Sequence, residues 1–494
     1  MLTVQYATGK IRRTGPKGEP LGWDVVKLRS YNGKLVGPVI EARPGDTLNI
    51  FLDNHLPPEP APGDHDVNVP HGFNITNLHF HGLHVSPAGN SDNVMLAFEP
   101  GQQFYYEVKI PDDHPAGTYW YHGHKHGSVA IQLASGMAGA LIIRGDIDEV
   151  PAIKAAREKI FLFQQIPYAI NPQTKVGEVE GYAFAPPGTW KTLGRRITIN
   201  GEVEPTVEMR PGEVQRWRFI HGGTREGLRV RLVKRSMGAA DVTIPQHQIA
   251  MDGITTGRLD QVQETELHPG YRADVLVSAT DAQGNPLPKG VYWLVDTSPD
   301  APAHAKVLAR VVVTGLAMKM KLPLPKELAS LAPFKNVADQ EITGTQECHF
   351  DIDVQSTPPR FLINGKPFDP ADPPRRLTLG KVEEWIVSST EIAGHPFHIH
   401  VNPFQCTLPD GRVVWKDTIF VPPGQEIRLR TRYERYIGTF VLHCHILPHE
   451  DLGMMQAVEI VPPGSAHDHG GHGGGGNGAG GHDHGGNGGA GHDS

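Results

Sequence analysis

A turn followed by a strand-like run recurs along this chain and constrains its fold more than any other feature. Each copy begins with a Pro-Gly pair, and alternating apolar and polar residues follow at once. Proline fixes φ before the bend, glycine permits a positive φ after it, and the alternation is typical of a half-buried strand. The copies are ARPGDTLNIFL (42–52), EPGQQFYYEVKI (99–110), RPGEVQRWRFI (210–220), HPGYRADVLV (268–277) and PPGQEIRLR (422–430), with a weaker copy, TLGKVEEWIV (378–387), in which leucine replaces proline.

The spacing of these copies predicts three repeated units. The copies fall into three pairs at similar intervals, and an Asn-Gly hairpin signal repeats in TINGE (198–202) and LINGK (362–366). Pro-Gly pairs are frequent in any chain with 57 glycines and 43 prolines, but frequency alone does not explain the even spacing. Because 494 residues exceed a single core, we expect an all-β fold of three tandem Greek-key β-sandwich domains. Their predicted bounds are 1–150, 151–325 and 326–464, with a helical connector near residue 150.

Composition narrows the possible partners and location. No run reaches the roughly 18–20 apolar residues that span a bilayer, so no membrane partner is expected. The formal charge of −8, without a long basic cluster, argues against nucleic acid. The first residues contain no apolar stretch of signal-peptide length. The protein therefore either stays inside the cell or begins here after removal of a signal, and the sequence leaves both open.

Three cysteines are too few for a disulfide framework. They are Cys348, Cys406 and Cys444. A bridge between Cys348 and Cys406 and a pair of free buried thiols are both compatible with the sequence. Cys444 stands apart, because it lies inside a cluster of histidines.

Histidines gather in four places, two in the first repeat and two in the third. These are HFHG (His79, His81), YHGHKH (His122, His124, His126), HPFHIH (His395, His398, His400) and HCHILPHEDLGM (His443, Cys444, His445, His449, Met454). Residues i and i+2 of a strand face the same side. His443 and His445 are therefore expected on one side and Cys444 on the other, so that only a few covalent bonds would separate two metal sites.

The residues on the Cys444 side favour copper. A thiolate from Cys444, two imidazoles from His395 and His449 and the weak thioether of Met454 form the ligand set of a blue-copper site. Structural zinc sites are usually richer in cysteine, so zinc fits less well. Isolated His-x-His pairs arise by chance, but four clusters shared between the first and last repeats do not fit that explanation.

With these four motifs, residues about 1–463 resemble the three-domain multicopper oxidases, the family of laccases, bilirubin oxidases and bacterial cuprous oxidases. The resemblance implies cupredoxin-like domains and four copper ions, with a trinuclear cluster between the first and third domains. It assigns the type 1 copper to His395, Cys444, His449 and Met454, the type 2 copper to His79 and His398, and the type 3 pair to His81, His122, His124, His400, His443 and His445. Met455 competes with Met454 for the axial position, and His126 has no ligand role.

The resemblance also implies a reaction: one-electron oxidation of a reducing substrate, coupled to four-electron reduction of dioxygen to water. Glu450 and Asp92 are the candidate proton donors. The alternatives are a turn-capping role for Asp92 and a solvated charge at a strand end for Glu450. Asp417, in VVWKDTIFV (413–421), either orients residues near the type 1 site or binds backbone across a turn.

The substrate is the least constrained part of this interpretation. The chain has ten methionines but no Met-rich segment of the kind that cuprous oxidases often carry, since MKM (318–320) lies in a linker. Phenols and aromatic amines are therefore the leading expectation, a cuprous or other metallo-oxidase the second, and a non-enzymatic copper carrier the third. The family favours a periplasmic or secreted location. A monomer is expected, because three repeats in one chain supply the contact between first and third domains.

The end of the chain has a different composition. Residues 465–494 consist mainly of Gly, His, Asp, Ala and Asn, so they are expected to be a disordered tail without a core. His and Asp in a flexible chain can capture Cu²⁺ or Ni²⁺. Copper acquisition and a solubilising end with incidental histidines remain alternatives. The histidines concerned are His467, His469, His472, His482, His484 and His492.

Overall fold

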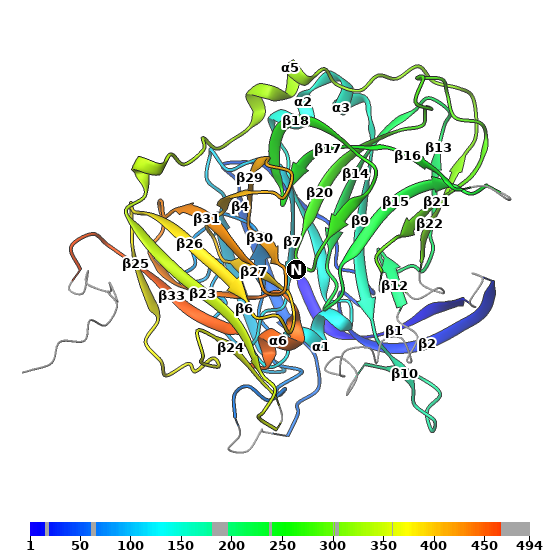
Figure 1. Cartoon of the computed structure of the whole chain (residues 1–494). Helices are drawn as coiled ribbons and strands as arrows, with labels where there is room; N and C mark the ends of the chain where they lie inside the picture. The colour runs from blue at the N-terminus through cyan, green and yellow to red at the C-terminus, as the bar shows by residue number, and fades with distance from the viewer. Residues whose placement is uncertain are drawn as a thin grey trace, which may run out of the picture.

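The chain forms three pairs of β-sheets, which follow one another in sequence (Figure 1). The computed structural model describes residues 1–14, 19–60, 66–179, 196–236, 240–299, 301, 306–357 and 359–465. The predicted tail histidines lie outside these residues. In the described part of the chain, no helix is long and apolar enough to cross a bilayer.

The first pair consists of a six-stranded and a four-stranded sheet. The larger sheet has the order β10 (Ala169–Ile170), β11 (Gly177–Glu178), β2 (Pro20–Tyr31), β1 (Leu2–Thr14), β4 (Thr47–Asn54), β6 (Gln103–Lys109). The smaller sheet has the order β3 (Ile40–Ala42), β8 (Ala138–Ile143), β7 (Gly117–His122), β5 (His79–His81). β10 and β11 come after residue 150 in the sequence, yet they extend this sheet, because β11 pairs with β2.

The middle pair follows a short helical connector, α2 (Asp146–Glu149) and α3 (Pro151–Ala155), which confirms the helix expected near residue 150. One sheet has the order β12 (Arg196–Ile199), β9 (Arg157–Ile166), β14 (Val214–His221), β20 (Arg272–Ser278), β17 (Gln246–Met251), β18 (Ile254–Val262). The other has the order β13 (Thr206–Met209), β22 (Val307–Val313), β21 (Gly290–Asp296), β15 (Leu228–Lys234), β16 (Val242–Ile244), and β19 (Thr265–Leu267) also pairs with β15.

The last pair follows a connector with one helical turn, α5 (Pro325–Leu328), and two 3₁₀ turns, Ala329–Leu331 and Asp339–Glu341. One sheet has the order β24 (Arg360–Ile363), β23 (Gly344–Asp353), β26 (Val382–Ser389), β31 (Glu426–Arg432), β28 (Phe404–Thr407), β29 (Val413–Lys416). The other has the order β25 (Arg375–Thr378), β33 (Met455–Val461), β32 (Gly438–Cys444), β27 (His395–Ile399), β30 (Thr418–Val421). Two further helices, α1 (Val129–Ala134) and α6 (Leu447–Asp451), lie side by side (Figure 1).

The repeated Pro-Gly turn is confirmed as the framework of all three units. Each of the six glycines has a positive φ, between 67° and 91°, and a strand begins two residues later. Within each unit the two strands so produced pair with each other in antiparallel register: β4 with β6, β14 with β20, and β26 with β31. The repeat in sequence is therefore a repeated strand pair in space.

The Asn-Gly hairpins are also confirmed, and the structure adds one that the sequence analysis missed. Asn200 and Asn364 have positive φ, as a two-residue hairpin turn requires. The first unit has the same turn at Asn32, in YNGK (31–34). The side-chain oxygen of each of the three asparagines accepts a backbone N–H hydrogen bond from a neighbouring strand.

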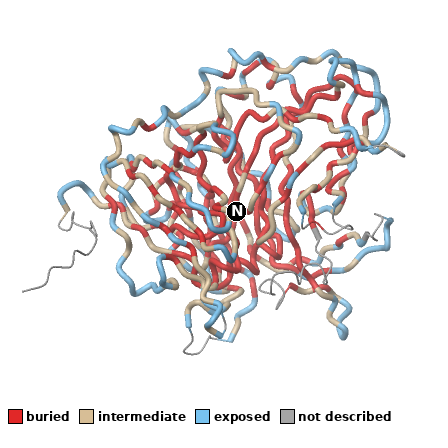
Figure 2. The backbone as a smooth tube through the Cα atoms, viewed as in Figure 1, coloured by how far each residue is buried: buried red, intermediate tan, exposed pale blue. Residues whose placement is uncertain are grey.

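Each unit has its own apolar core between its two sheets, and Figure 2 shows the buried strands in the interior with the exposed segments in the loops. The third core contains Cys348 and Cys406 as free, buried thiols. β23 and β28, which carry them, are separated by β26 and β31. Neighbouring strands of a sheet lie about 4.8 Å apart, so three such spacings place β23 and β28 about 14 Å apart. A disulfide needs Cα atoms within about 7 Å of each other. The sheet order therefore decides the question in favour of two free thiols.

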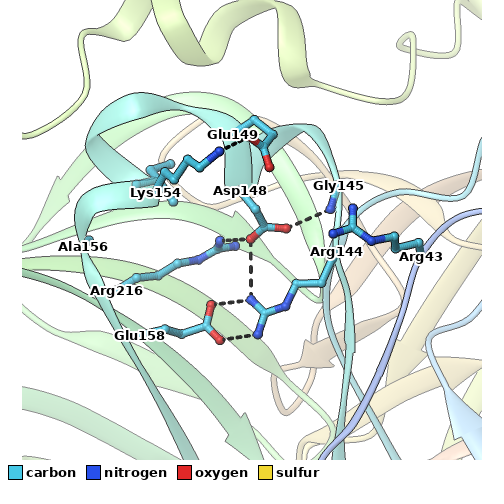
Figure 3. A pocket seen from close by; sticks show the side chains of 10 residues that line it. Arg43, Arg144, Gly145, Asp148, Glu149, Lys154, Ala156, Glu158 and Arg216 are labelled. Carbon is cyan, nitrogen blue, oxygen red and sulfur yellow. Dashed lines mark hydrogen bonds and ion pairs between the residues drawn. The ribbon is translucent and has the colours of Figure 1, made fainter.

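A cluster of charges joins the first unit to the second. Arg216 and Arg218 are buried in it, and the side chains of Arg144, Asp148 and Glu158 are 18–24% exposed. Arg216 on β14 contacts Asp148 of the connector at 2.6 Å, and Arg144, at the end of β8, binds Glu158 on β9 through two hydrogen bonds (Figure 3). Arg218, beside Arg216 on the same face of β14, pairs with Glu158 and with Asp274 of β20. Each buried charge thus has opposite charges around it, as burial requires.

Candidate metal centres

The strand registers bring the histidine clusters together. In the first unit His79 on β5 lies opposite His122 on β7, and in the third unit His398 on β27 lies opposite His443 on β32. The two units then face each other through their rings. The rings of His79 and His400 stack with centroids 4.0 Å apart, and so do the rings of His81 and His398. The cluster therefore forms only where the first and third units meet.

Eight buried histidines make up this cluster: His79, His81, His122, His124, His398, His400, His443 and His445. Nε2 of His443 lies 3.2 Å from Nε2 of His124 and 3.3 Å from Nε2 of His400. Nε2 of His445 lies 3.4 Å from Nδ1 of His81. His124 and His445 lie just past the ends of β7 and β32. The rule that residues i and i+2 of a strand face the same side therefore applies only partly to them. Even so, the His443 and His445 rings lie 5.5 Å apart.

Several of these rings use one nitrogen to bind the protein and direct the other into the cluster. Nδ1 of His79 donates to Asp92, that of His122 to the Gly123 carbonyl, and that of His398 to the Asp417 carbonyl. The opposite nitrogens, Nε2 of all three rings, are buried without a hydrogen-bond partner among the described residues. Buried polar atoms without partners are rare unless an ion or water satisfies them, so the donor set fits metal binding.

Burial also favours the protonation state that binds metal. Burial lowers the pKa of His398 to about 3 and that of His443 to about 4, and it lowers the pKa of His79 as well. The imidazoles are therefore neutral at ordinary pH, and neutral imidazole is the form that coordinates a metal. Copper and zinc both accept imidazole, so the choice between them depends on the second site.

The second site contains a thiol and two imidazoles. Sγ of Cys444 lies 3.4 Å from Nδ1 of His395 and 3.9 Å from Nδ1 of His449, and the two nitrogens are 3.3 Å apart. Burial raises the pKa of Cys444, so its thiolate would be favoured only with a cation in the site. The small triangle of one sulfur and two nitrogens fits copper.

The positions of the two methionines differ. Met454 packs in the same core cluster as Cys444, and its carbonyl accepts a hydrogen bond from the Cys444 N–H. Met455 packs in a separate cluster with Val94 and Val441. Met454 is therefore the methionine on the Cys444 side.

The two sites are joined through the chain itself. Cys444 belongs to the second site, and His443 and His445, its neighbours in sequence, belong to the eight-histidine cluster. Only a short run of covalent bonds therefore separates the Cys444 sulfur from each imidazole.

Glu450 and Asp92 are both buried beside cluster histidines. Oε2 of Glu450 lies 3.0 Å from Nδ1 of His443, and Oε1 lies 3.5 Å from Nδ1 of His124. Burial raises the pKa of each carboxyl to about 7. A solvated charge at a strand end is thus wrong for Glu450, which lies on α6 and is inaccessible to solvent. Asp92 accepts hydrogen bonds from His79 and from the Phe80 N–H, so it does not cap its own turn.

Several other residues have a clear position. His126 contacts Asn68 and the ring of Phe368 and belongs to neither site. Asp417 lies beside the histidine cluster, 3.2 Å from Nε2 of His81, and not at the Cys444 site.

Asp451 was missed in the sequence analysis, although it follows Glu450. Its carboxylate accepts backbone hydrogen bonds from the first unit.

A hollow of about 990 Å³ opens near the Cys444 site, where all three units meet. The ring of Phe361 lines it and stacks on the imidazole of His449, with centroids 4.5 Å apart and planes inclined by 28°. Phe368, Val69, Asp66 and Asp369 also line it. The hollow is thus separated from His449 by a single aromatic ring.

A buried site with one thiolate and two imidazoles, bonded through the chain to a cluster of eight histidines between cupredoxin-like sandwiches, defines a class of copper oxidoreductases. The chain belongs to the multicopper oxidase family. Sequence models described as multicopper oxidase match residues 67–147, 173–313 and 337–464. As in that family, the protein is a copper-dependent oxidoreductase that uses a small-molecule reductant and dioxygen.

Known proteins similar to this chain support the same conclusion. The chain is 29% identical to a laccase from Bacillus stratosphericus, over 88% of this chain and 91% of that protein. The crystal structure of a laccase from Pediococcus acidilactici is similar, with a TM-score of 0.71 and 26% identity over 93% of this chain and 89% of that one. A multicopper oxidase from Campylobacter jejuni, a metallo-oxidase, has a TM-score of 0.66 and 25% identity over 93% and 90%. The expected cupredoxin-like all-β fold is confirmed by these structures.

Proposed function

We propose that this multicopper oxidase takes electrons one at a time from phenols and aromatic amines near His449 and uses them to reduce dioxygen to water at the histidine cluster. Four copper ions, when bound, supply the redox chemistry and the place where dioxygen is reduced. The stacking of Phe361 on His449, at the edge of a hollow large enough for an aromatic ring, is the observation that carries the substrate assignment.

The proposed ligands follow the two sites. His395, Cys444 and His449, together with Met454, would hold the type 1 copper. His79 and His398 would hold the type 2 copper, and the groups His124, His400, His443 and His81, His122, His445 would hold the type 3 pair. The assignments are supported by the distances between ring nitrogens, and hydrogen bonds from Nδ1 fix the rings of His79, His122, His398 and His443.

The chain's own atoms provide a route for electrons between the two sites. The Cys444 sulfur and the imidazoles of His443 and His445 are linked by the backbone of three consecutive residues. His443 is held in place, because its Nδ1 donates to the Cys444 carbonyl at 3.1 Å. The fixed geometry keeps this route short and constant.

Proton supply is assigned to Glu450. Its Oε2 lies 3.0 Å from Nδ1 of His443, neither carboxyl oxygen has a hydrogen-bond partner among the described residues, and a pKa of about 7 lets the group hold or release a proton near neutral pH. Asp92 has a similar pKa but accepts two hydrogen bonds, from His79 and the Phe80 N–H. We therefore assign Asp92 a larger part in orienting His79.

An aromatic substrate suits the hollow better than a metal ion does. Phe361 and Phe368 offer flat apolar faces, and prolines at 359 and 367 line the same space. A substrate ring that stacks on Phe361 would lie one ring away from the His449 imidazole. A metallo-oxidase remains the second candidate, because Asp66 and Asp369 offer carboxylates in the hollow and the similar Campylobacter protein is a metallo-oxidase.

The test compares 2,6-dimethoxyphenol and Cu(I) as reductants for the copper-loaded, full-length protein, with oxygen consumption as the readout. Phe361→Leu should raise the KM for the phenol about tenfold, leave the blue absorption intact and change Cu(I) oxidation little. Phe334→Leu, which alters a partly buried ring that packs on Trp415, is the matched control. Oxygen uptake with Cu(I) alone would establish the metallo-oxidase, and a blue protein without oxygen uptake would establish a copper carrier.

We propose that the protein acts as a monomer. The first and third units of one chain already meet at the histidine cluster, so no second chain is required to complete it. The molar mass in solution should then equal that of one chain, 53.9 kDa. A dimer or trimer at working concentrations would contradict this proposal.

A further inference from the structure

The middle unit supplies none of the described metal-ligand groups, yet one of its side chains reaches the histidine cluster. Arg272 begins β20 and is fully buried. Its guanidinium donates two parallel hydrogen bonds to Asp417, from Nη1 to Oδ1 at 2.8 Å and from Nη2 to Oδ2 at 2.5 Å. Such a two-point contact fixes the plane of the carboxylate as well as its position.

Asp417 in turn touches one histidine from each of the two outer units. Oδ1 of Asp417 lies 3.2 Å from Nε2 of His81, and its backbone carbonyl accepts a hydrogen bond of 2.8 Å from Nδ1 of His398. The Thr418 hydroxyl donates to the same Oδ1. If Nε2 of His81 carries the proton, its Nδ1 is free to face the cluster, where it lies 3.4 Å from His445.

Arg272 is itself held rigidly from all sides. Its Nε donates to the Thr118 carbonyl of the first unit, and the two terminal nitrogens also donate to the carbonyls of Gly270 and Asp252. The Asp252 carboxylate accepts the Arg272 backbone N–H and pairs with Lys416 at 3.0 Å. Two cations and two carboxylates thus form a buried, balanced group that joins the middle and third units, and the Thr118 carbonyl connects it to the first.

We infer that Arg272 is a positioning residue of the histidine cluster, which holds Asp417 so that His81 and His398 present the correct nitrogens to copper. The inference rests on the proposed function, since it concerns how the same cluster binds copper. Asp417 could instead be a ligand, because it lies near His81 and His398. Its two carboxylate oxygens are, however, already engaged by Arg272 and Thr418.

The physical reason is that partners behind a ligand determine its tautomer and orientation. Loss of such a partner typically weakens metal binding by about 10- to 100-fold. Lysine in place of Arg272 would keep the positive charge but offer no planar pair of donors. Asp417 could then turn away from His81, while the Cys444 site, which Arg272 does not touch, would keep its geometry.

The experiment uses the full chain loaded with Cu(II) and compares Arg272→Lys with Arg218→Lys. Arg218 is an equally buried arginine of the middle unit that pairs with Asp274 and Glu158 rather than with a partner of the cluster. Copper retained per chain is measured against a graded series of chelator concentrations, and the electron paramagnetic resonance signal of type 2 copper is recorded. Blue absorption reports the type 1 site, and circular dichroism reports folding.

Arg272→Lys should bind copper in the cluster about 10- to 100-fold more weakly, with an altered type 2 signal and unchanged blue absorption, whereas Arg218→Lys should match the wild type. Equal copper retention and an unchanged signal in Arg272→Lys, or the same loss in both variants, would overturn the inference. If Arg272→Lys does not fold, Asp417→Asn takes its place under the same criteria. A wild-type protein that retains copper but takes up no oxygen would contradict the proposed function. The comparison of copper binding between Arg272→Lys and Arg218→Lys would still test the role of Arg272.

Discussion

The carboxylate of Asp451 accepts a hydrogen bond of 2.7 Å from the backbone N–H of Ala130, which lies 321 residues earlier in the chain. It also accepts the N–H groups of Gly127 and Val129. The third unit thereby caps the start of α1 in the first unit, where Ser128 makes no side-chain cap of its own. Because α6 also carries His449 and Glu450, this contact fixes the approach of α6 to the histidine cluster.

Replacing Asp451 with alanine should destabilise the protein. Three buried N–H groups would lose their acceptor, and unsatisfied buried donors cost about 1–3 kcal/mol each at most sites. We expect the free energy of unfolding in urea to fall by about 2 kcal/mol or more. Asp369→Ala, which removes an acceptor from an exposed turn, should change it by no more than about 0.5 kcal/mol. Equal effects of the two substitutions would contradict the capping role.

Replacing Glu450 with glutamine should slow oxygen consumption about 100-fold while copper content stays the same. The amide has the shape of the carboxyl beside His443 but cannot take up and release a proton, and such groups contribute at least about 100-fold to rate. Oxygen uptake at saturating phenol and copper per chain are the measurements. Glu459→Gln, on β33 of the same unit, is the control. Undiminished turnover in Glu450→Gln would remove Glu450 from the reaction.

Replacing Asp92 with asparagine should have a milder effect. The amide oxygen can still accept the hydrogen bonds of His79 and of the Phe80 N–H, so copper should remain bound when it is in excess. Loss of the negative charge behind His79 should still lower oxygen consumption about tenfold, in line with other partners behind metal ligands. Asp92→Asn with wild-type turnover would show that the charge is dispensable.

The ion pairs of Glu158 predict how stability depends on pH. Burial alone would raise the pKa of Glu158, but the hydrogen bond from Arg144 and the charge of Arg218 outweigh it and lower the pKa to about 2. Glutamate has a pKa of about 4.3 in an unfolded chain, so the stabilisation is complete above that value and disappears as pH falls toward 2. The difference in unfolding free energy between wild type and Glu158→Gln should therefore shrink between pH 6 and pH 3. A constant difference would contradict this assignment.

Local sequence predicted those features that depend on a few neighbouring residues. The six glycines of the Pro-Gly and Leu-Gly pairs have positive φ, because only the adjacent backbone determines whether that conformation is tolerated. The placement of His79 and His81 on one strand was also predictable, because it depends only on three consecutive residues. The hairpin at Asn32 was equally predictable, since it uses the same Asn-Gly signal as Asn200 and Asn364.

Only the tertiary structure decided which distant groups meet. The order of strands in the third unit separates Cys348 from Cys406, and the docking of α6 on the first unit buries Glu450 beside His124 and His443. Contacts of this kind follow from strand register and from the packing of whole sheets, which sum many weak interactions over the entire chain. By itself, then, the sequence determined the repeated strand pairs and the residues able to bind copper. The packing of the three units determined that Arg272, Asp417 and Asp451 hold those residues in place.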